Sequence, residues 1–496
     1  MSTREGTNSG PELLLGLDRG AGRPLRAQLE DGLREAVRSG RLAAHARLPP
    51  SRALADDLGV SRRLVVDAYA QLLAEGYLVA RRGAGTFVAD TPSSSAAPAA
   101  ERDPEAPAFD FFPGYPDLAS FPRAAWLRVM RETLRTAPDR AFGYPDPRGA
   151  PELRQALAAH LRRVRGVVVE PHAIVVCAGA AQGFALLARA IGRPPAPPRV
   201  AVEDPGLPAH RAILSAHGAE LLALAVDAEG ARIEELSGLA AAAGAIDAVL
   251  VTPAHQSPTG VALSPARRAA LLAWASDVDG LVIEDDYDAE YRYDRAPLAA
   301  MQGLAPERVV YMGTVSKTLA PALRIGWLVL PARLRDAVVG QKVLADHGSP
   351  TLDQLALARL LDSGAYDRHL RIARRRYRAR RDALVRALAR HLPGARVTGA
   401  AAGLHAIVRL DRPVDGLALV RLARERSVGV YPLGYGYMDI RSVDDGLVLG
   451  YANLAEPAIE EGIRRLADAL AELPSGPPPD RVGTGPTNEG GAIARY

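Results

Sequence analysis

The stretch GTVSKTLAPALRIGW, residues Gly313–Trp327, carries the strongest indication of the fold. It begins after the apolar run Val309–Met312 and leads into a second one, Ile325–Leu330, and both have the length of buried strands. Its fifth residue is Lys317, and only Lys317 and Lys342 are lysine among the chain's 61 basic residues. We expect Lys342 to lie on the surface of a helix. Any chemistry that needs a primary amine therefore points to Lys317.

Further apolar runs alternate with helical stretches on both sides of this segment. The predicted strands are Ile174–Cys177, Val200–Val202, Ala248–Thr252, Leu281–Glu284, Val309–Met312 and Ile325–Leu330. Such alternation predicts an α/β fold with a mostly parallel sheet covered by helices. After about residue 340 helical patterns dominate, with strands at Leu404–Arg409 and Leu447–Leu449, which predicts a smaller α+β lobe.

Length and composition narrow the class of protein. A chain of 496 residues with 48 % hydrophobic and 24 % charged residues has the balance of a globular protein with two or three domains. A single cysteine, Cys177, excludes an internal disulfide and fits the cytoplasm. We expect no secretory signal in residues 1–10 and no membrane span, because no apolar run reaches about 18 residues. We interpret Cys177 and His405 as packed residues without metal ligands around them.

Two segments lack the apolar residues that a core needs. Residues 91–108, TPSSSAAPAAERDPEAPA, are predicted to be a linker, and residues 474–496 a disordered tail. We therefore expect a small domain at 13–90 and a large one at 109–473. The large lobe of the second domain is placed at about 145–335, and its small lobe at about 340–473.

The small domain shows the pattern of three helices and a hairpin. Apolar residues recur every four positions from Leu25 to Val37, Ser51 is predicted to cap a second helix that stops at Gly59, and Ser61 a third. Two short strands follow, Tyr77–Ala80 and Thr86–Ala89. The spacing fits a helix-turn-helix, and the third helix would be its recognition helix.

Arginine side chains gather where such a domain would meet DNA. The candidates for DNA contact are Arg52, Ser61, Arg62, Arg63, Arg82 and Gly85. The first turn of the recognition helix would reach base edges and phosphates, and the glycine tip of the hairpin suits close approach to the backbone or minor groove. Helical spacing alone leaves a protein-interaction module with a solvated arginine face equally open.

Residues around Lys317 match the needs of pyridoxal 5'-phosphate (PLP), which forms an imine with a lysine and requires an acid at its ring nitrogen. Asp285 stands at the end of a predicted strand, and Tyr287 is placed to donate to the ring oxygen. Thr314 and Arg324 flank the lysine and are placed to reach the phosphate. The turn Ala178-Gly179-Ala180-Ala181 opens a helix whose N–H groups can cradle that phosphate.

Three further strings carry a resemblance to known families. RLPPSRALADDLGVSRRLVVDAYAQLLAEGYLVARRGAGTFV closely resembles the winged helix-turn-helix of GntR-type bacterial regulators, over Leu25 to Val88. EDDYDAEYRYD, TPAHQSPTG and the lysine stretch resemble the fold-type I aminotransferases, which are PLP-dependent. Together the two parts are similar to the MocR subfamily, in which an aminotransferase-like domain serves as effector sensor.

The resemblance implies roles for individual residues. It implies Lys317 as the imine lysine, Asp285 on the ring nitrogen and Tyr287 on the ring oxygen. Thr314, Arg324 and the turn with Ala180 and Ala181 would hold the phosphate. Tyr144 would reach the cofactor phosphate of the partner subunit in a homodimer. Arg409 and Arg441 are candidates for binding an effector carboxylate.

The sequence departs from the family pattern at three positions. Leu207 stands where the family mostly has a tyrosine that stacks on the cofactor ring, Ala180 replaces a hydroxyl residue, and Ser257 replaces an aromatic residue or asparagine. Loss of ring stacking costs on the order of 1 kcal/mol. The arginine-rich run 371–381, RIARRRYRARR, is interpreted as a solvated, ion-paired helix face and not as a second nucleic-acid patch.

These observations predict a cytoplasmic transcription regulator that binds double-stranded operator DNA as a homodimer. Its large domain would sense PLP itself, an amine or an amino acid, and we expect sensing in place of enzymatic turnover. Two alternatives stay open: an active aminotransferase that carries a DNA-binding module, and a regulator whose large domain has lost the cofactor and only dimerises.

Overall fold

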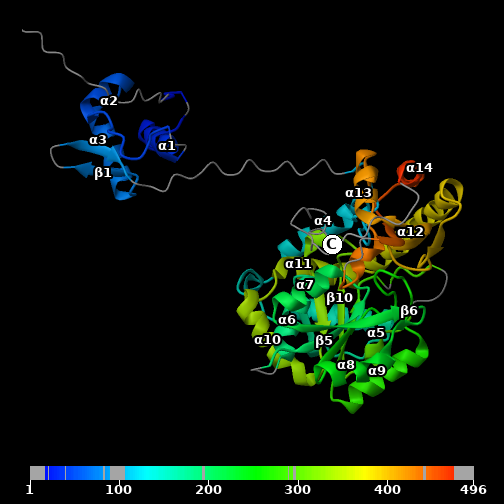
Figure 1. The fold of residues 1–496 in the computed structure, drawn as a ribbon. Helices are drawn as coiled ribbons and strands as arrows, with labels where there is room; N and C mark the ends of the chain where they lie inside the picture. The colour runs from blue at the N-terminus through cyan, green and yellow to red at the C-terminus, as the bar shows by residue number, and fades with distance from the viewer. Residues whose placement is uncertain are drawn as a thin grey trace, which may run out of the picture. The chain divides into compact units, whose positions relative to one another are not determined.

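A computed structural model of the chain describes residues 17–20, 22–38, 41–81, 84–89, 107–192, 196–288, 290–293, 298–439 and 443–473. Contacts within the chain divide it into two compact units between Glu105 and Ala106 (Figure 1). The predicted tail and nearly all of the predicted linker lie outside the described residues.

The N-terminal unit contains three helices and a hairpin, in the predicted order. Its elements are α1 (Leu25–Arg38), α2 (Ser51–Leu58), α3 (Arg62–Ala74), β1 (Leu78–Arg81) and β2 (Gly85–Val88). The two strands pair antiparallel, with Leu78 opposite Val88. Leu29 and Leu33 of α1 are buried against Val65 and Leu72 of α3, so the apolar stripe predicted on the first helix faces the core.

Of the two N-cap residues predicted from the sequence, one is confirmed and one is wrong. The Ser61 hydroxyl accepts a hydrogen bond of 3.3 Å from the Leu64 N–H, so Ser61 caps α3 as predicted. Gly59 ends α2 with a φ of 62°, a left-handed conformation that favours glycine. The predicted cap at Ser51 is wrong, because Pro50 takes the capping position and Ser51 is already the first helical residue.

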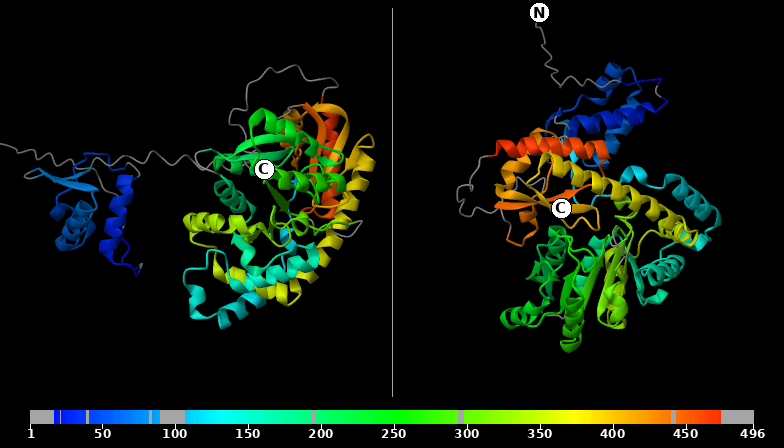
Figure 2. Two further views of the ribbon diagram at one scale, coloured as in Figure 1. Left: turned by 90° about the horizontal axis from the view of Figure 1, so that it is seen from below. Right: turned by 90° about the vertical axis from the view of Figure 1, so that its right-hand side faces the viewer.

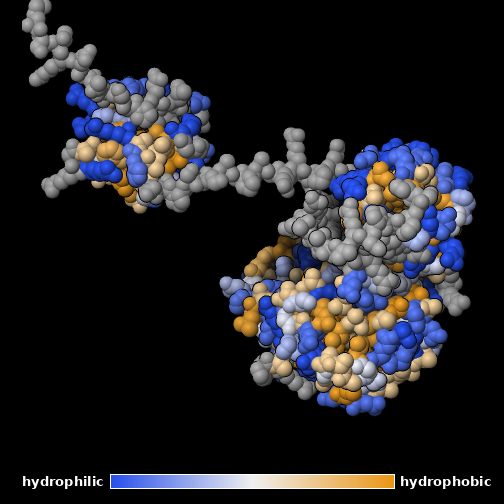
Figure 3. Space-filling model, viewed as in Figure 1, coloured by the Kyte–Doolittle hydropathy of each residue, from blue (hydrophilic) through white to orange (hydrophobic). Residues whose placement is uncertain are grey.

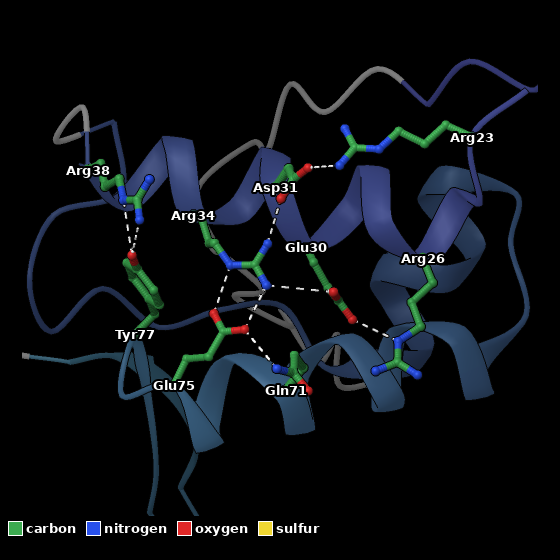
Figure 4. A network of polar contacts seen from close by, with 9 residues as sticks. All are labelled: Arg23, Arg26, Glu30, Asp31, Arg34, Arg38, Gln71, Glu75 and Tyr77. Carbon is green, nitrogen blue, oxygen red and sulfur yellow. Dashed lines mark hydrogen bonds and ion pairs between the residues drawn. The ribbon is translucent and has the colours of Figure 1, made fainter. Parts of the chain in front are cut away.

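Ion pairs fasten α1 to the end of α3 (Figure 4). The Arg34 guanidinium donates to both carboxylate oxygens of Glu75 at 2.7 Å and to Asp31 at 2.5 Å. These hydrogen bonds hold the pKa of Glu75 at about 2. Next to this pair, Arg38 donates to the Tyr77 hydroxyl, 2.5 Å away. The network fixes the angle between the first helix and the helix-turn-helix.

An eight-stranded sheet forms the centre of the second unit, in the order β4-β11-β10-β9-β8-β5-β6-β7 among the described residues. Its strands are β4 (Ile174–Cys177), β5 (Arg199–Asp204), β6 (Glu220–Asp227), β7 (Gly230–Ala231), β8 (Ala248–Val251), β9 (Leu281–Asp286), β10 (Val309–Thr314) and β11 (Gly326–Val329). The run from β10 to β6 is parallel, whereas β11 pairs antiparallel with both β10 and β4. The mostly parallel sheet is confirmed.

Helices cover both faces of this sheet (Figures 1 and 2). The helices of the large lobe and its flank are α4 (Arg123–Thr136), α5 (Pro151–Arg165), α6 (Ala180–Ile191), α7 (Pro208–Ala216), α8 (Leu236–Ala243), α9 (Pro265–Asp277), α10 (Ala332–Asp346) and α11 (Thr351–Asp362). Neighbouring residues of β9 point to opposite faces: Ile283 packs with α6, α7 and α10, and Val282 packs with α8 and α9. The result is a three-layer α/β/α arrangement.

The C-terminal part forms a smaller α+β lobe, as predicted. Its elements are the long helix α12 (Ala365–His391), the strands β12 (Arg396–Thr398), β13 (His405–Asp415) and β15 (Val443–Gly450), and the helices α13 (Gly416–Glu425) and α14 (Glu456–Glu472). The three strands form one antiparallel sheet. The short strand β3 (Phe109–Asp110) pairs with β14 (Val428–Gly429), so the start of the second unit is tied to this lobe.

The surface in view in Figure 3 carries hydrophilic and hydrophobic residues side by side. Within the described part of the chain, no helix is both long and apolar enough to cross a membrane. The same residues hold no group of three or more His, Cys, Asp or Glu side chains that could bind a metal ion. Cys177 and His405 are buried, in agreement with their interpretation as packed residues.

Candidate cofactor site and DNA-binding surface

Lys317 lies in the turn between β10 and β11, at the carboxyl edge of the parallel strands, where α/β sheets bind ligands. Its Nζ atom is 3.5 Å from the position that a Cβ atom would take at Gly114, so a side chain there would crowd the amine. The Tyr291 hydroxyl donates to the Lys317 carbonyl oxygen at 3.3 Å and holds the turn. Burial lowers the pKa of Lys317, which favours the neutral, nucleophilic amine.

Asp285 is the most unusual polar group of the site. It is the last residue but one of β9, opposite Met312 of β10, and its side chain is almost fully buried. Neither of its carboxylate oxygens has a hydrogen-bond partner among the described residues. Burial, together with the nearby Asp286 and Asp288, raises the pKa of Asp285 to about 8. A buried carboxyl group without partners carries a large desolvation cost unless a ligand pairs with it.

His210 of α7 is a site residue that the sequence analysis missed. Its Nδ1 atom lies 3.6 Å from the Asp285 Oδ2 atom, and its ring centroid lies 4.3 Å from that of Phe184. Burial lowers the pKa of His210 to about 3, so the imidazole is neutral at physiological pH. The only signal in the sequence is its spacing, three residues after Leu207, which places both on one side of the start of α7.

The predicted phosphate turn and Arg324 lie together. Gly179 precedes α6 with a φ of 80°, and Ala180 and Ala181 open the helix. The Arg324 guanidinium donates to the Ala178 carbonyl oxygen, and its Nη1 atom is 3.2 Å from the Cβ position of Gly179. A helix N-terminus beside a guanidinium is a favourable place for a phosphate.

Hydroxyl groups beside Lys317 form a small cluster of their own. The Thr314 hydroxyl lies 2.9 Å from that of Ser316, and accepts a hydrogen bond of 3.1 Å from the Ser316 N–H. The sequence analysis included Thr314 and missed Ser316. The signal was present, since Ser316 is the residue before the lysine.

Tyr287 and Ser257 also meet, in a network with His255. The Tyr287 hydroxyl donates to the His255 carbonyl oxygen at 3.1 Å and lies 3.2 Å from the His255 Nδ1 atom. It is also hydrogen-bonded to the Ser257 side chain. The His255 ring is held by Asp288 at 3.0 Å. This places Tyr287 within a polar network, so its hydroxyl is held in one orientation.

Other predicted residues lie further from this cluster or outside the described chain. Leu207 is a half-buried residue at the start of α7, and Tyr144 is 96 % exposed. Arg409 lies on β13, where its Nη1 atom is 3.2 Å from the Cβ position of Gly446. Arg441 is outside the described residues, so its carboxylate-binding role and that of Arg409 stay predictions.

The surface position predicted for Lys342 is wrong. Lys342 lies on α10, yet its side chain has no exposed surface. Its Nζ atom donates to Gln182 at 2.8 Å, to Asp346 at 2.6 Å and to Ser349 at 2.9 Å, which uses all three of its protons. The Gln182 Oε1 atom also accepts the Ala178 N–H at 2.8 Å. Lys342 therefore supports the phosphate turn through Gln182, which Lys342 and Ala178 both contact.

Lys342→Met is expected to lower the free energy of unfolding by about 3 kcal/mol, because it leaves Asp346, Gln182 and Ser349 without their shared donor. Leu344→Ala, at a 79 % exposed position of the same helix, is the matched control. Chemical denaturation of the full chain measures both. Equal midpoints for the two variants would contradict the supporting role.

The candidate DNA-binding residues lie on the exposed side of the N-terminal unit. Arg62 and Arg63 begin α3, and the Arg63 side chain is 92 % exposed. Arg52 is exposed on α2, and Gly85 opens β2 with a φ of 112°. Arg82 is outside the described residues. Two exposed arginines at the start of the third helix suit contact with DNA phosphates and base edges.

The residues of the second unit fit PLP. The buried carboxyl group of Asp285 has no hydrogen-bond partner within the described ranges, and the cofactor's ring nitrogen would supply one. The lysine with the lowered pKa belongs to the same electrostatic cluster, since Asp285 and Lys317 shift each other's pKa. The start of α6 and Arg324 provide donors for a phosphate.

Taken with the helix-turn-helix and its wing, this site defines a class of protein: a DNA-binding regulator joined to an aminotransferase-like domain. Residues 25–88 match the family described as bacterial regulatory proteins, gntR family, and residues 115–466 match aminotransferase class I and II. The chain belongs to the GntR-type transcription regulators with an aminotransferase-like domain, the MocR subfamily.

Individual relatives support this assignment. The chain is 35 % identical to the probable rhizopine catabolism regulatory protein MocR of Rhizobium meliloti, over 93 % of this chain and 97 % of that protein. It is 36 % identical to the pyridoxine biosynthesis transcriptional regulator PdxR of Corynebacterium glutamicum, over 90 % and 95 %. The structure of a multiple substrate aminotransferase from Thermococcus profundus is similar with a TM-score of 0.68 and 27 % identity, over 73 % of this chain and 91 % of that one. The resemblance and the fold class expected from the sequence are confirmed.

Proposed function

We propose that this transcription regulator binds PLP at Lys317 and changes its operator binding when PLP, an amine or an amino acid occupies the site. The observation that carries the proposal is the buried carboxyl group of Asp285, which has no hydrogen-bond partner in the described part of the chain and lies in one electrostatic cluster with a lysine of lowered pKa. We place the protein in the cytoplasm, as a homodimer in which Tyr144 reaches the partner's site. Its 96 % exposure leaves that side chain accessible to a second subunit.

PLP, when bound, supplies an aldehyde that condenses with a primary amine. The side chains around it decide how it is held. Burial lowers the pKa of Lys317 and so favours the neutral amine over the ammonium ion. Arg324, Thr314 and the start of α6 hold the phosphate, and Tyr287 is oriented by His255 toward the ring oxygen.

Asp285 provides the proton at the ring nitrogen. Since burial raises its pKa to about 8, the carboxyl group is mostly protonated at pH 7 before the cofactor binds. The proton that the nitrogen needs is thus already on the Asp285 carboxyl group, and it is shared once the ring is in place. His210 is neutral at this pH and packs beside the carboxyl group without adding a charge.

Sensing in place of turnover is supported by the regulator names of the relatives and by Leu207. An aliphatic side chain at the start of α7 gives less ring stacking than an aromatic one, by on the order of 1 kcal/mol. An effector amine that takes the place of Lys317 would free this side chain, and the change would reach the DNA-binding units. Operator affinity measured at rising PLP concentrations, and separately at rising amine concentrations, tests the proposal. An affinity that stays constant in every titration would refute it.

Asp285→Asn is expected to weaken PLP binding at least about tenfold, since a charge-assisted hydrogen bond is worth about 1.5–3 kcal/mol. The amide keeps the size of the side chain and removes its acidity. Asp336→Asn, at an exposed position of α10, is the matched control. Titration of the visible absorbance with PLP measures the affinity, and equal affinities in the two variants would show that Asp285 does not face the ring.

A further inference from the structure

A cavity lies in the second unit, and no residue of the phosphate turn lines it. It has a volume of about 170 Å³, which is far above the ~15 Å³ that one water molecule requires. Its polar walls come from α5, from α12 and from the segment after β9: His160, Arg163, Arg165, Glu290, Asp367, Arg371 and Arg374. None of these side chains belongs to the PLP site proposed above.

Arg165 offers an unpaired donor at this cavity. Only 2 % of the residue is exposed. Its Nε atom donates to Asp286 at 2.7 Å and its Nη1 atom to the Leu298 carbonyl oxygen at 2.6 Å. The Nη2 atom is buried and has no hydrogen-bond partner among the described residues. A buried guanidinium donor without a partner is rare, and it indicates a missing acceptor.

The charge balance of the cavity favours an anion. Arg163 is paired with Asp367 at 2.8 Å, and Arg165 with Asp286. Arg374 uses its Nε and Nη2 atoms on the Glu290 carbonyl oxygen, at 3.0 and 2.6 Å, and keeps its full positive charge. Arg371 is exposed and forms no ion pair with a described residue. Two guanidinium charges are thus left without a carboxylate partner among the residues that the structure describes.

Asp367 also lines the cavity, where it is paired with Arg163, and neither His160 nor Glu290 reverses this balance. Burial lowers the pKa of His160 to about 4, so its ring is neutral at pH 7. Burial and the nearby Asp286 raise the pKa of Glu290 to about 7, so its carboxyl group is partly protonated there. A protonated carboxyl group can donate a hydrogen bond to an oxyanion.

We propose that this cavity binds a phosphate-like oxyanion, as free phosphate or as the terminal group of a phosphate ester. Arg165 lines the cavity and has one unpaired guanidinium nitrogen, and Arg371 and Arg374 supply two positive charges from α12. Arginine is suited to this role because its planar guanidinium group matches the geometry of a phosphate.

The cavity is connected to the turn of Lys317 through α12. Near the start of that helix, the Tyr366 hydroxyl donates to the Thr318 hydroxyl at 2.8 Å, and the His369 Nε2 atom lies 2.8 Å from the Thr318 carbonyl oxygen. Thr318 is the residue after the cofactor lysine. An anion held by Arg371 and Arg374 would therefore fix the helix turns that support this residue.

Calorimetric titration of the full-length, PLP-saturated protein with inorganic phosphate tests the proposal. We expect binding to be at least tenfold weaker in Arg371→Gln/Arg374→Gln than in Arg375→Gln, whose exposed side chain is on the same helix and outside the cavity. Because PLP fills its own site and the DNA-binding unit is unchanged, the difference between the two variants reports this cavity. Arg371→Gln alone repeats the test without touching the bonds of Arg374 to Glu290.

Two comparisons decide the result and the source of the anion. Equal phosphate affinity in the double variant and in Arg375→Gln, or equal heat from chloride at the same ionic strength, would overturn the proposal. Glycerol 3-phosphate is titrated in parallel: binding as tight as that of phosphate supports an ester as the ligand, and binding of phosphate alone supports the free ion.

Discussion

Lys317→Ala will leave the purified protein without the visible absorbance of bound PLP and without any response of its operator binding to PLP or amines. Alanine removes the amine at the cofactor aldehyde, and Lys342, the other lysine, has all three protons in hydrogen bonds and no exposed surface. Absorbance spectra with added PLP, followed by operator titrations with and without it, measure the two effects. The expected loss is complete, because the chain has no other accessible lysine and its many arginine side chains cannot form an imine.

Arg375→Ala serves as the control, since it removes an exposed basic side chain of α12 and keeps both lysines. It should show the spectrum of the wild type. If wild type itself shows no absorbance with excess PLP, the large domain has lost the cofactor and only dimerises. Steady turnover of amino acids with a keto acid acceptor, at the rate of a dedicated enzyme, would instead favour an active aminotransferase.

Arg62→Ala combined with Arg63→Ala should weaken operator binding by at least about tenfold for each DNA-binding unit. Both residues begin α3, and the Arg63 side chain is 92 % exposed with only a distant partner, Asp67 at 3.9 Å. A good arginine contact with a base is worth about 1–3 kcal/mol, and loss of phosphate contacts also reduces the dependence of affinity on salt. Affinity for operator fragments at two salt concentrations separates the two contributions.

Arg23→Ala is the matched control for this pair. Arg23 precedes α1 and is paired with Asp31, so its loss removes one positive charge without touching the recognition helix. Operator affinity equal to that of the double variant would show that only net charge matters. Unchanged affinity in the double variant, with normal thermal unfolding, would refute the assignment of α3 as the recognition helix.

Strong local patterns allowed much of the fold to be predicted. The runs Ile174–Cys177 and Leu281–Ile283 are apolar on both faces, as strands covered by helices on both sides must be, and they form β4 and the first half of β9. The strand β6 was missed because ELLALAVD is rich in Leu and Ala, which favour helix, and because it is only partly buried. Pairing with β5 decides its conformation, and the local sequence does not contain that partner.

The site was predictable where it follows strand ends and was not where it depends on tertiary contacts. Lys317, Asp285 and the turn at Gly179 each stand next to a recognisable strand. His210 reaches Asp285 from another helix, and its burial depends on Phe184. For Lys342, burial is decided by Gln182 and Ser349, which come from other parts of the chain. Only its spacing of four residues to Asp346 was visible in the sequence.

The burial of Lys342 has a practical consequence for work on the protein in solution. Amine-selective reagents attack neutral, accessible amines, and Lys342 is neither exposed nor free of hydrogen bonds. In a chain with two lysines, Lys317 is then the one ε-amine left to react while the fold is intact. A fluorophore or affinity probe aimed at amines would mark the ligand site and the α-amino group alone, and ligands that protect the site could be ranked by the label they exclude.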